Sequence, residues 1–215
     1  MSEPLTSARE YEKELTRIFN RFNKHFWNNE LPEVIITFVP TPMRHGHMSS
    51  APVWHSKNKD IESKYELNIS ALDIDRTPEE ICGTLLHEQV HLYCAINDIK
   101  DTSNNHRYHN KTFKRIAEDH GLIISLHPDP TIGWSKTELD ENAKKYVKKL
   151  NVKQFELHRD IHTSKTPLIR MQCPDCLESV CWVSSLQELI CGYCGASLIP
   201  MASQQKRVKK YKGMK

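Results

Sequence analysis

The chain lacks the features that mark membrane and secreted proteins. Its 215 residues contain no apolar run as long as a transmembrane helix, only 38% of them are hydrophobic, and the mean hydropathy is −0.61. Residues 1–5 lack the basic and hydrophobic regions of a signal peptide. We therefore expect a cytoplasmic protein that does not bind a membrane.

The net charge is also small, at +3 from 30 Lys and Arg residues and 27 Asp and Glu residues. The length is enough for one domain with a proper core and a small additional module. Seven cysteines are present. Because disulfides are rare in a reducing cytosol, metal binding explains the cysteines better than the alternative, which is disulfide bonds or a redox pair.

What the chain does contain is a short motif of two histidines and a glutamate. His87, Glu88 and His91 form the pattern HExxH. Two histidines four residues apart on a helix lie on one face, close enough to bind one metal ion, and the glutamate is then placed to act on a water at that metal. The pattern is typical of zinc metallopeptidases. The alternative is two ordinary histidines beside an acid.

The residues around this motif predict that it lies on a helix. Thr77 suits the N-cap, Pro78 suits the first helical position, and Glu80 completes a capping box. The helix should continue to about Cys94, and a metal would approach its small-residue face. The residues predicted to share that face with the histidines are Gly83, Thr84 and Cys94.

A catalytic zinc ion needs three protein ligands, so a third must come from elsewhere in the chain. The downstream candidates are His106, His109 and Glu118. His109 precedes segment 110–121, which predicts a helix, and it shares a face with Phe113, so it should point inward. His106 should lie in the preceding loop, and Glu118 is further from the motif than expected. We therefore favour His109, whose alternative role is capping or packing.

The remaining residues predict helices and a small sheet. A strand is expected at 34–39, a run of β-forming residues. Another is expected at 65–70, where apolar and polar residues alternate. A third strand is expected around 53–55, and a mixed-charge helix over 136–153. An N-terminal helix carries a single apolar stripe formed by Tyr11, Leu15, Ile18, Phe19, Phe22 and Phe26.

A second metal-binding pattern lies near the C-terminus, where two CxxC pairs are separated by fourteen residues. Two such pairs at about this separation bind structural zinc tetrahedrally. The flanking segments 168–171 and 180–183 are rich in β-forming residues. We therefore predict a zinc ribbon whose metal stabilises the fold and does no chemistry. Its predicted ligands are Cys173, Cys176, Cys191 and Cys194.

With these motifs in place, the sequence resembles a known family. The HExxH motif, a polar spacer, His109 and then Phe113 are similar to the pattern of the SprT-like zinc metallopeptidases, which is HExxH, a spacer and His-Gly-x-x-Phe. This family includes Spartan, a protease that degrades proteins crosslinked to DNA. The glycine usual after the third histidine is Asn110 here, a residue that tolerates unusual backbone angles better than most. Segments 15–23 and 44–46 also resemble the start of SprT-like domains.

The resemblance implies an α+β fold. A zincin-like metalloprotease domain, with helices packed on a small β-sheet, would occupy residues 1–165, followed by a small β zinc ribbon over 166–201. Two zinc ions would bind, one catalytic and one structural. In zincins a sheet edge beside the metal commonly holds the substrate backbone as an added strand. Three further histidines are expected to face solvent or substrate instead of binding metal: His45, His47 and His55.

Charge is unevenly distributed along the chain. The last ten residues contain six cations and no acid, so the tail, 202–215, is expected to be disordered alone and to favour phosphate backbones. Side chains of the ribbon, Tyr193 among them, would add cationic and stacking contacts to single-stranded DNA. The alternative is a solubilising tail and a ribbon that only packs on the protease. The predicted nucleic-acid-binding residues are Arg170, Trp182, Lys206, Arg207, Lys209, Lys210 and Lys212.

Together these patterns predict a zinc-dependent endopeptidase of the SprT-like type. Zinc on His87, His91 and His109 would lower the pKa of its water, and Glu88 would take the proton and return it to the leaving amine. The expected substrates are exposed protein segments, including DNA-associated or DNA-crosslinked proteins. The protein should be a monomer, associated with the nucleoid if DNA binding holds.

Two alternatives remain open. One is a zinc-ribbon nucleic-acid-binding adaptor or regulatory protein with a weak or inactive peptidase site, against which the intact Glu88 argues. The other is a regulatory peptidase that cleaves a single repressor.

Overall fold

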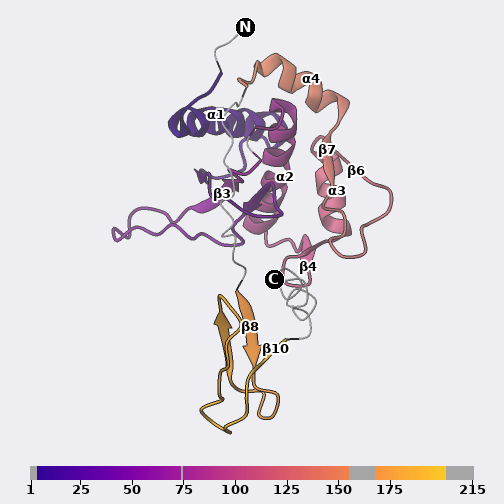
Figure 1. The fold of residues 1–215 in the computed structure, drawn as a ribbon. Coiled ribbons are helices and arrows are strands. Elements are labelled where there is room, and N and C mark those ends of the chain that lie inside the picture. Colours follow the sequence, from indigo (N-terminus) through magenta and orange to yellow (C-terminus); the bar gives the residue numbers. More distant parts are fainter. Residues whose placement is uncertain (1–3, 74, 155–167, 202–215) are drawn as a thin grey trace. The chain divides into compact units, whose positions relative to one another are not determined.

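The computed structural model describes residues 4–73, 75–154 and 168–201 (Figure 1). The chain divides into two compact units, Met1–Ile161 and His162–Lys215. Helices and small sheets make up the described part, which confirms the predicted α+β class. None of the helices in this part is long and apolar enough to span a membrane. The predicted basic tail lies outside the described residues.

The first unit begins with helix α1, Ala8–Phe26. Ser7 caps the helix in a capping box with Glu10, whose backbone N–H donates to the Ser7 hydroxyl. The apolar stripe predicted from the sequence packs into the core, so this prediction is confirmed. Its buried members are Tyr11, Leu15, Ile18, Phe19 and Phe22, and Phe26 packs against them partly buried.

A three-stranded sheet follows, with the strand order β1-β3-β2. The central strand β3, Tyr65–Ile69, runs parallel to β1, Val34–Thr37, and antiparallel to β2, Gly46–Met48. Strand β2 is therefore an edge strand, and one side of its backbone is not paired within the sheet.

This sheet differs from the prediction in two respects. The third strand is β2, whereas Trp54, at the position expected for that strand, forms only an isolated bridge. The alternation predicted for 65–70 is wrong at its polar positions, because Asn68 and Ser70 are fully buried. The Asn68 amide donates to the Val39 carbonyl and accepts from the Val39 N–H. A buried polar side chain thus satisfies backbone groups of the adjoining loop instead of facing solvent.

Helix α2, Pro78–Ile96, passes through the middle of the unit (Figure 1). Thr77 caps it with the predicted capping box, so its predicted start is confirmed. Gln89 on this helix is fully buried, accepts a hydrogen bond from the Trp27 indole and donates to the Phe19 carbonyl. These buried bonds join residues far apart in sequence, so they fix the rotation of α2 relative to α1.

The predicted small-residue face of α2 is right for Gly83 and Thr84 and wrong for Cys94. Gly83 and Thr84 line the groove beside the histidines, whereas Cys94 is in the core with 1% exposure. Ala95 takes its place in the groove, because it lies four residues after His91 and hence on the same face.

Two small antiparallel sheets and helix α3 frame the site. Strand β4, Thr102–Ser103, pairs with β5, Tyr108–His109, and α3, Lys111–Asp119, follows where a helix was predicted. Strand β6, Leu122–Ile124, pairs with β7, Thr137–Leu139. Strands of two or three residues give no usable periodicity, so these pairs could not be predicted from the sequence.

Helix α4, Glu141–Leu150, is shorter than the helix predicted over 136–153. Strand β7 occupies the first part of that range. Asp140 accepts a hydrogen bond from the backbone N–H of Ala143 and so caps α4, and Asn151 ends the helix with a φ of 48°. The aspartate N-cap was a signal that the sequence analysis overlooked.

The second unit is the ribbon. Strand β8, Ile169–Gln172, lies between β9, Val180–Val183, and β10, Ile199–Pro200, and pairs antiparallel with both. The first two strands confirm the β segments predicted from composition.

Candidate metal centre and its groove

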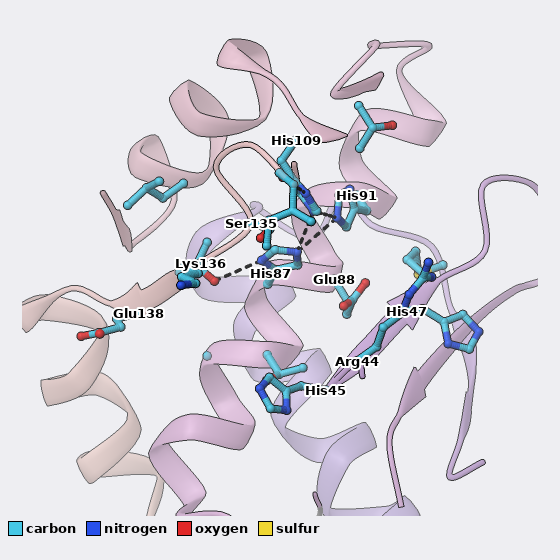
Figure 2. A pocket seen from close by; sticks show the side chains of 18 of the residues that line it. Arg44, His45, His47, His87, Glu88, His91, His109, Ser135, Lys136 and Glu138 are labelled. Carbon is cyan, nitrogen blue, oxygen red and sulfur yellow. Dashed lines mark hydrogen bonds between the residues drawn. The ribbon is translucent and has the colours of Figure 1, made fainter. Parts of the chain in front are cut away.

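Three histidine side chains converge on one point in the first unit (Figure 2). His87 and His91 come from consecutive turns of α2, and His109 comes from β5. Their Nε2 atoms are separated by 3.2 Å from His87 to His109, 3.2 Å from His91 to His87, and 3.1 Å from His91 to His109. The three nitrogens therefore form a nearly equilateral triangle.

The second ring nitrogen of each histidine has its own hydrogen-bond partner. The Nδ1 contacts are His91 with the Asp101 carboxylate at 2.5 Å, His87 with the Thr137 hydroxyl at 3.0 Å, and His109 with the Ile132 carbonyl at 3.2 Å. A carbonyl or carboxylate oxygen accepts, so the proton lies on Nδ1 in those two rings. In these two rings Nε2 is then free to direct a lone pair into the triangle, whereas the Thr137 hydroxyl can donate to or accept from His87.

The triangle fits a zinc ion. Zinc binds imidazole nitrogen at about 2.0–2.1 Å, and tetrahedral geometry places two such nitrogens about 3.3 Å apart. The observed separations of 3.1 to 3.2 Å are close to that value. Among the described residues this cluster holds three ligand groups, which leaves the fourth position that a catalytic zinc needs.

Burial and neighbouring charges set the protonation of the three rings. Burial, together with repulsion from His91, lowers the pKa of His109 to about 4 and holds the pKa of His87 well below its usual value. Burial also acts to lower the pKa of His91, but the hydrogen bond to Asp101 and the charges of Glu88 and Asp101 outweigh it and raise that pKa. Two of the rings are therefore neutral at neutral pH, which is the form that binds metal.

Asp101 fixes the orientation of the His91 ring through its contact with Nδ1, the nitrogen outside the triangle. Burial acts to raise the pKa of Asp101, but the hydrogen bond and the charge of His91 outweigh it, so the pKa is lowered. An ionised carboxylate on Nδ1 increases the basicity of Nε2 and strengthens its bond to a metal.

Glu88 lies on α2 beside the triangle and is only 5% exposed. Burial raises the pKa of its carboxyl to about 7, against the opposing charges of His91 and Arg44 and a hydrogen bond from the Met48 backbone. A divalent cation bound by the histidines would favour the carboxylate and so lower this pKa. Burial thus raises this pKa and a bound cation would lower it, and a carboxyl under these opposing influences can both take and return a proton.

Gly46 allows the edge strand β2 to approach Glu88 closely. A Cβ atom at this position would lie 2.9 Å from the Asn68 carbonyl oxygen, 3.0 Å from Cγ2 of Thr84 and 3.2 Å from Oε1 of Glu88. Any side chain would therefore force β2 away from the buried carboxylate.

The segment before β7 wraps around His109. The His109 N–H donates to the Ile132 carbonyl, and the Trp134 N–H donates to the His109 carbonyl, both at 3.1 Å. Gly133 has a φ of 67°, and a Cβ there would lie 2.1 Å from the His109 carbonyl oxygen, so only glycine fits. A segment that begins 23 positions downstream thus holds the third histidine in place.

Asn110 stands where the SprT-like pattern has glycine. Its φ of −91° and ψ of −176° are angles that any residue adopts. Its side-chain oxygen accepts hydrogen bonds from the backbone N–H groups of Thr112 and Phe113, and so caps α3. The departure from the pattern therefore introduces no backbone strain and supplies a helix cap.

The other candidates from the sequence lie outside the triangle. His106 lines the groove but is not part of the histidine cluster. Glu118 forms an ion pair with Lys114 at 2.9 Å and is 43% exposed. His45 and His55 bond to side chains other than the three histidines.

An open groove runs across the triangle (Figure 2). One wall contains β2 and the turn before it, and the other contains residues from β6, β7 and segment 131–136. The labelled residues that line the groove with Glu88 and the three histidines are Arg44, His45, His47, Ser135, Lys136 and Glu138. The unpaired edge of β2 is thus beside the metal-binding point.

Four cysteine sulfurs converge in the second unit. The Sγ atoms of Cys173 and Cys194 are 3.3 Å apart, those of Cys176 and Cys191 are 3.7 Å apart, and all four lie within 4.8 Å of one another. A tetrahedral zinc with Zn–S bonds of about 2.3 Å places its sulfurs about 3.8 Å apart. The cluster therefore fits a closed four-thiolate site with no position for water or substrate.

Hydrogen bonds favour the thiolate form of Cys191 and Cys173, whereas contacts with the sulfurs of Cys173 and Cys191, together with burial, raise the pKa of Cys194 to about 12. The Ser179 hydroxyl lies 2.9 Å from Sγ of Cys191 and, with the backbone amide of Cys194, lowers the pKa of Cys191 to about 6. The backbone amide of Cys176 likewise lowers the pKa of Cys173. The thiolate is the form that binds zinc.

The ribbon exposes two aromatic side chains and carries a half-buried arginine. The Arg170 guanidinium lies 5.8 Å from the centroid of the Trp182 ring, its partner across β8 and β9. Trp182 is 58% exposed and Tyr193 is 84% exposed. The predicted tail contacts lie outside the described residues: Lys206, Arg207, Lys209, Lys210 and Lys212.

Phe113 contacts all three histidine rings and was expected beside His109, but the polar and backbone groups that act on the histidines from outside the motif were not predicted from the sequence. These groups belong to Asp101, Thr137, Ile132 and Gly133, together with Arg44 in the groove wall. Gly133 carried a turn signal, but nothing in the local sequence linked that turn to His109.

A comparison with known families places this site in context. A sequence model of the SprT-like family matches residues 15–129, more than half of the chain and a range that includes the three histidines and Glu88. The ribbon lies outside the matched residues. No curated protein matched the chain, and no solved structure matched it. The family match confirms the resemblance seen in the sequence, and the chain belongs to the SprT-like family.

Proposed function

We propose that the protein is a zinc-dependent endopeptidase that cleaves exposed or unfolded segments of other proteins. The observation that carries the proposal is the convergence of three Nε2 atoms beside a buried glutamate in an open groove. Membership of the SprT-like family supports it.

The residues of the chain would divide the work of peptide hydrolysis. Zinc held by His87, His91 and His109 would supply an activated water and polarise the substrate carbonyl. Glu88 takes a proton from the water as the new C–O bond forms and the carbonyl π electrons move onto oxygen. Glu88 then returns that proton to the amide nitrogen as the C–N bond breaks. The products are one chain with a new carboxyl group and one with a new amine.

The edge strand β2 supports an extended substrate. A substrate segment can add to the unpaired edge as a further strand, held by main-chain hydrogen bonds that need no particular side chain. Gly46 and Met48 keep this edge beside Glu88. Selection would therefore depend on whether a segment is exposed and extended more than on its sequence.

The ribbon and the basic tail would bring the protease to DNA. Arg170, Trp182 and Tyr193 offer cationic and stacking contacts to single-stranded DNA, and the tail offers contacts to phosphates. Tethering raises the local concentration of the protease near DNA-bound or DNA-crosslinked proteins. A site with little side-chain selectivity could then act selectively.

Casein cleavage by the full-length, zinc-loaded protein tests the peptidase proposal. Cleavage should stop when zinc is chelated and return when zinc is restored. A protein with both zinc sites filled that cleaves neither casein nor an unstructured peptide, with or without DNA, would leave the nucleic-acid-binding adaptor as the better assignment.

Fluorescence anisotropy with a labelled single-stranded oligonucleotide tests the DNA proposal. Binding should weaken steeply as salt rises, because the contacts are mostly to phosphates. Deleting residues 202–215 should reduce the salt dependence of binding. Trp182→Ala should weaken binding but leave its salt dependence unchanged. Absence of binding at low salt would remove the link to DNA and leave the peptidase proposal standing.

A further inference from the structure

We propose that Arg44 supplies the positive charge that stabilises the oxygen anion formed when the peptide carbonyl is attacked. This inference rests on the proposed peptidase function and deepens it. Peptide hydrolysis places a full negative charge on the former carbonyl oxygen, and donors already oriented toward that charge contribute strongly to the rate.

The backbone around Arg44 is anchored so that its position in the groove wall is defined. Arg44 lies just before the edge strand β2. Its N–H donates to the Thr41 carbonyl, and the next carbonyl, that of His45, accepts from the Ser70 N–H. Met43 has a φ of 64°, a left-handed conformation that non-glycine residues rarely adopt. This turn leads the chain from the sheet into the wall of the groove.

The Arg44 guanidinium is near the reaction centre and uncommitted. Its charge acts on both Glu88 and His109. Among the described residues it has no hydrogen-bond or salt-bridge partner, so its five N–H donors remain available to a substrate. Arg76 in the same groove differs, because it donates to the Asp73 carbonyl and to a threonine hydroxyl.

The geometry of β2 explains why the carbonyl oxygen would come within reach of Arg44. The Met48 backbone binds the Glu88 carboxylate, so a substrate strand added to β2 brings its carbonyl carbon beside Glu88. Arg44 enters from the turn that precedes the same strand. Figure 2 shows Arg44 and Glu88 on one side of His87 and Lys136 on the other. No tyrosine is among the described residues that line the groove. Arg44 is therefore the donor best placed on the side where the water is activated.

Steady-state kinetics on full-length, zinc-loaded protein with an unstructured fluorogenic peptide tests this role. Arg44→Ala should lower kcat by about 10²–10³-fold. KM should change by less than about threefold, because the interaction forms only in the transition state. Zinc content and melting temperature should not change. Guanidinium chloride at millimolar concentration should restore part of the lost kcat, whereas urea should not, and Arg44→Lys should be intermediate.

Arg115→Ala is the control, because Arg115 is exposed and pairs with Asp119 on α3, outside the groove. Its kinetics should match those of the unaltered protein. A raised KM with unchanged kcat in Arg44→Ala would overturn the inference, since Arg44 would then bind substrate and not the transition state. Arg107 is another arginine that lines the groove. Loss of zinc in Arg44→Ala, or an equal loss of kcat in Arg107→Ala, would also overturn the inference. If the unaltered protein cleaves nothing, the peptidase proposal itself fails. If it cleaves and Arg44→Ala matches it, only the role of Arg44 falls.

Discussion

The two candidate metal sites are built in opposite ways. The histidines are brought together by helix α2 and strand β5, in a unit whose core consists of aliphatic and aromatic side chains. In the described part of the ribbon, two of the four buried apolar residues are metal-ligand candidates. These residues are Met171, Cys173, Val183 and Cys191. The difference indicates that the first unit has a core without metal, whereas the ribbon's core is largely the metal site.

The sites also differ in what orients their ligands. Each cysteine pair is held by short-range backbone bonds, such as Cys173 N–H to the Ser179 carbonyl and Cys191 N–H to the Ala196 carbonyl. Each histidine is held by a residue from a different segment. Four candidate ligands would close the ribbon site, and three would leave the other site open. One site is therefore suited to stability and the other to chemistry.

The largest expected effect is that of metal removal, to which the two units should respond differently. Cys191→Ser, or a strong chelator, should unfold the ribbon and leave the first unit folded, because structural zinc contributes about 10–16 kcal/mol to folding at neutral pH. Hydrogen exchange resolved along the chain should show loss of protection from β8 to β10 alone. Cys181→Ser is the matched control, since Cys181 lies on β9 outside the cluster. Persistent protection of the ribbon without zinc would contradict the comparison.

Glu88→Gln should reduce kcat by about 10²–10⁴-fold, because the substitution removes the group that takes and returns the proton. Zinc content by elemental analysis should remain near two per chain, since Glu88 is not a ligand. His109→Ala provides the contrast, because it should lose one zinc as well as activity. If Glu118→Ala released that zinc and His109→Ala did not, the histidine triangle would be the wrong site.

Asp101→Asn should weaken zinc binding at the open site by about 10–100-fold, because the neutral amide no longer increases the basicity of His91. Competition with a chelator of known affinity measures this change, and the ribbon zinc should be unaffected. Asp73→Asn is the control, since Asp73 bonds to His45, which is not in the triangle. Equal weakening in the two variants would show that the effect of Asp101 is only a general loss of negative charge.

The smallest expected effect is a change in the stability of the first unit that does not depend on metal. Burial acts to raise the pKa of Glu14, but hydrogen bonds from Arg17 and from the Lys153 N–H outweigh it, so the pKa is lowered. The stabilisation is complete above the unfolded value of 4.5 and is lost as pH falls through the lower folded pKa. Glu14→Gln should cost about 1 kcal/mol at pH 7, measured by urea unfolding.

That difference should shrink as the pH falls below 4.5, because protonation of Glu14 in the unaltered protein removes the same interaction. Glu12→Gln, at an exposed position on α1, should leave the free energy of unfolding unchanged at both pH values. A difference between Glu14→Gln and the unaltered protein that did not depend on pH would contradict the assignment.

Predictions from the sequence succeeded where a structure depends on residues within one or two turns. The Thr77 capping box, the stripe on α1 and the ribbon strands are examples. Predictions failed where packing overrode local pattern. Asn68 is buried despite its alternating position, and β7 replaces the start of a predicted helix. Hydrogen bonds between segments distant in the sequence decide both outcomes.

By itself, the sequence determined that a histidine pair would lie on one helical face and that four cysteines had the spacing of a zinc ribbon. It also determined membership of the SprT-like family. Only the tertiary structure decided that His109, rather than His106 or Glu118, completes the histidine cluster. It alone brought Asp101 and Thr137 to the rings, and Arg44 to the groove wall. The physical reason is that a helix or a CxxC turn is set by local backbone geometry. The third ligand and its supports depend on packing between segments that share no local sequence signal.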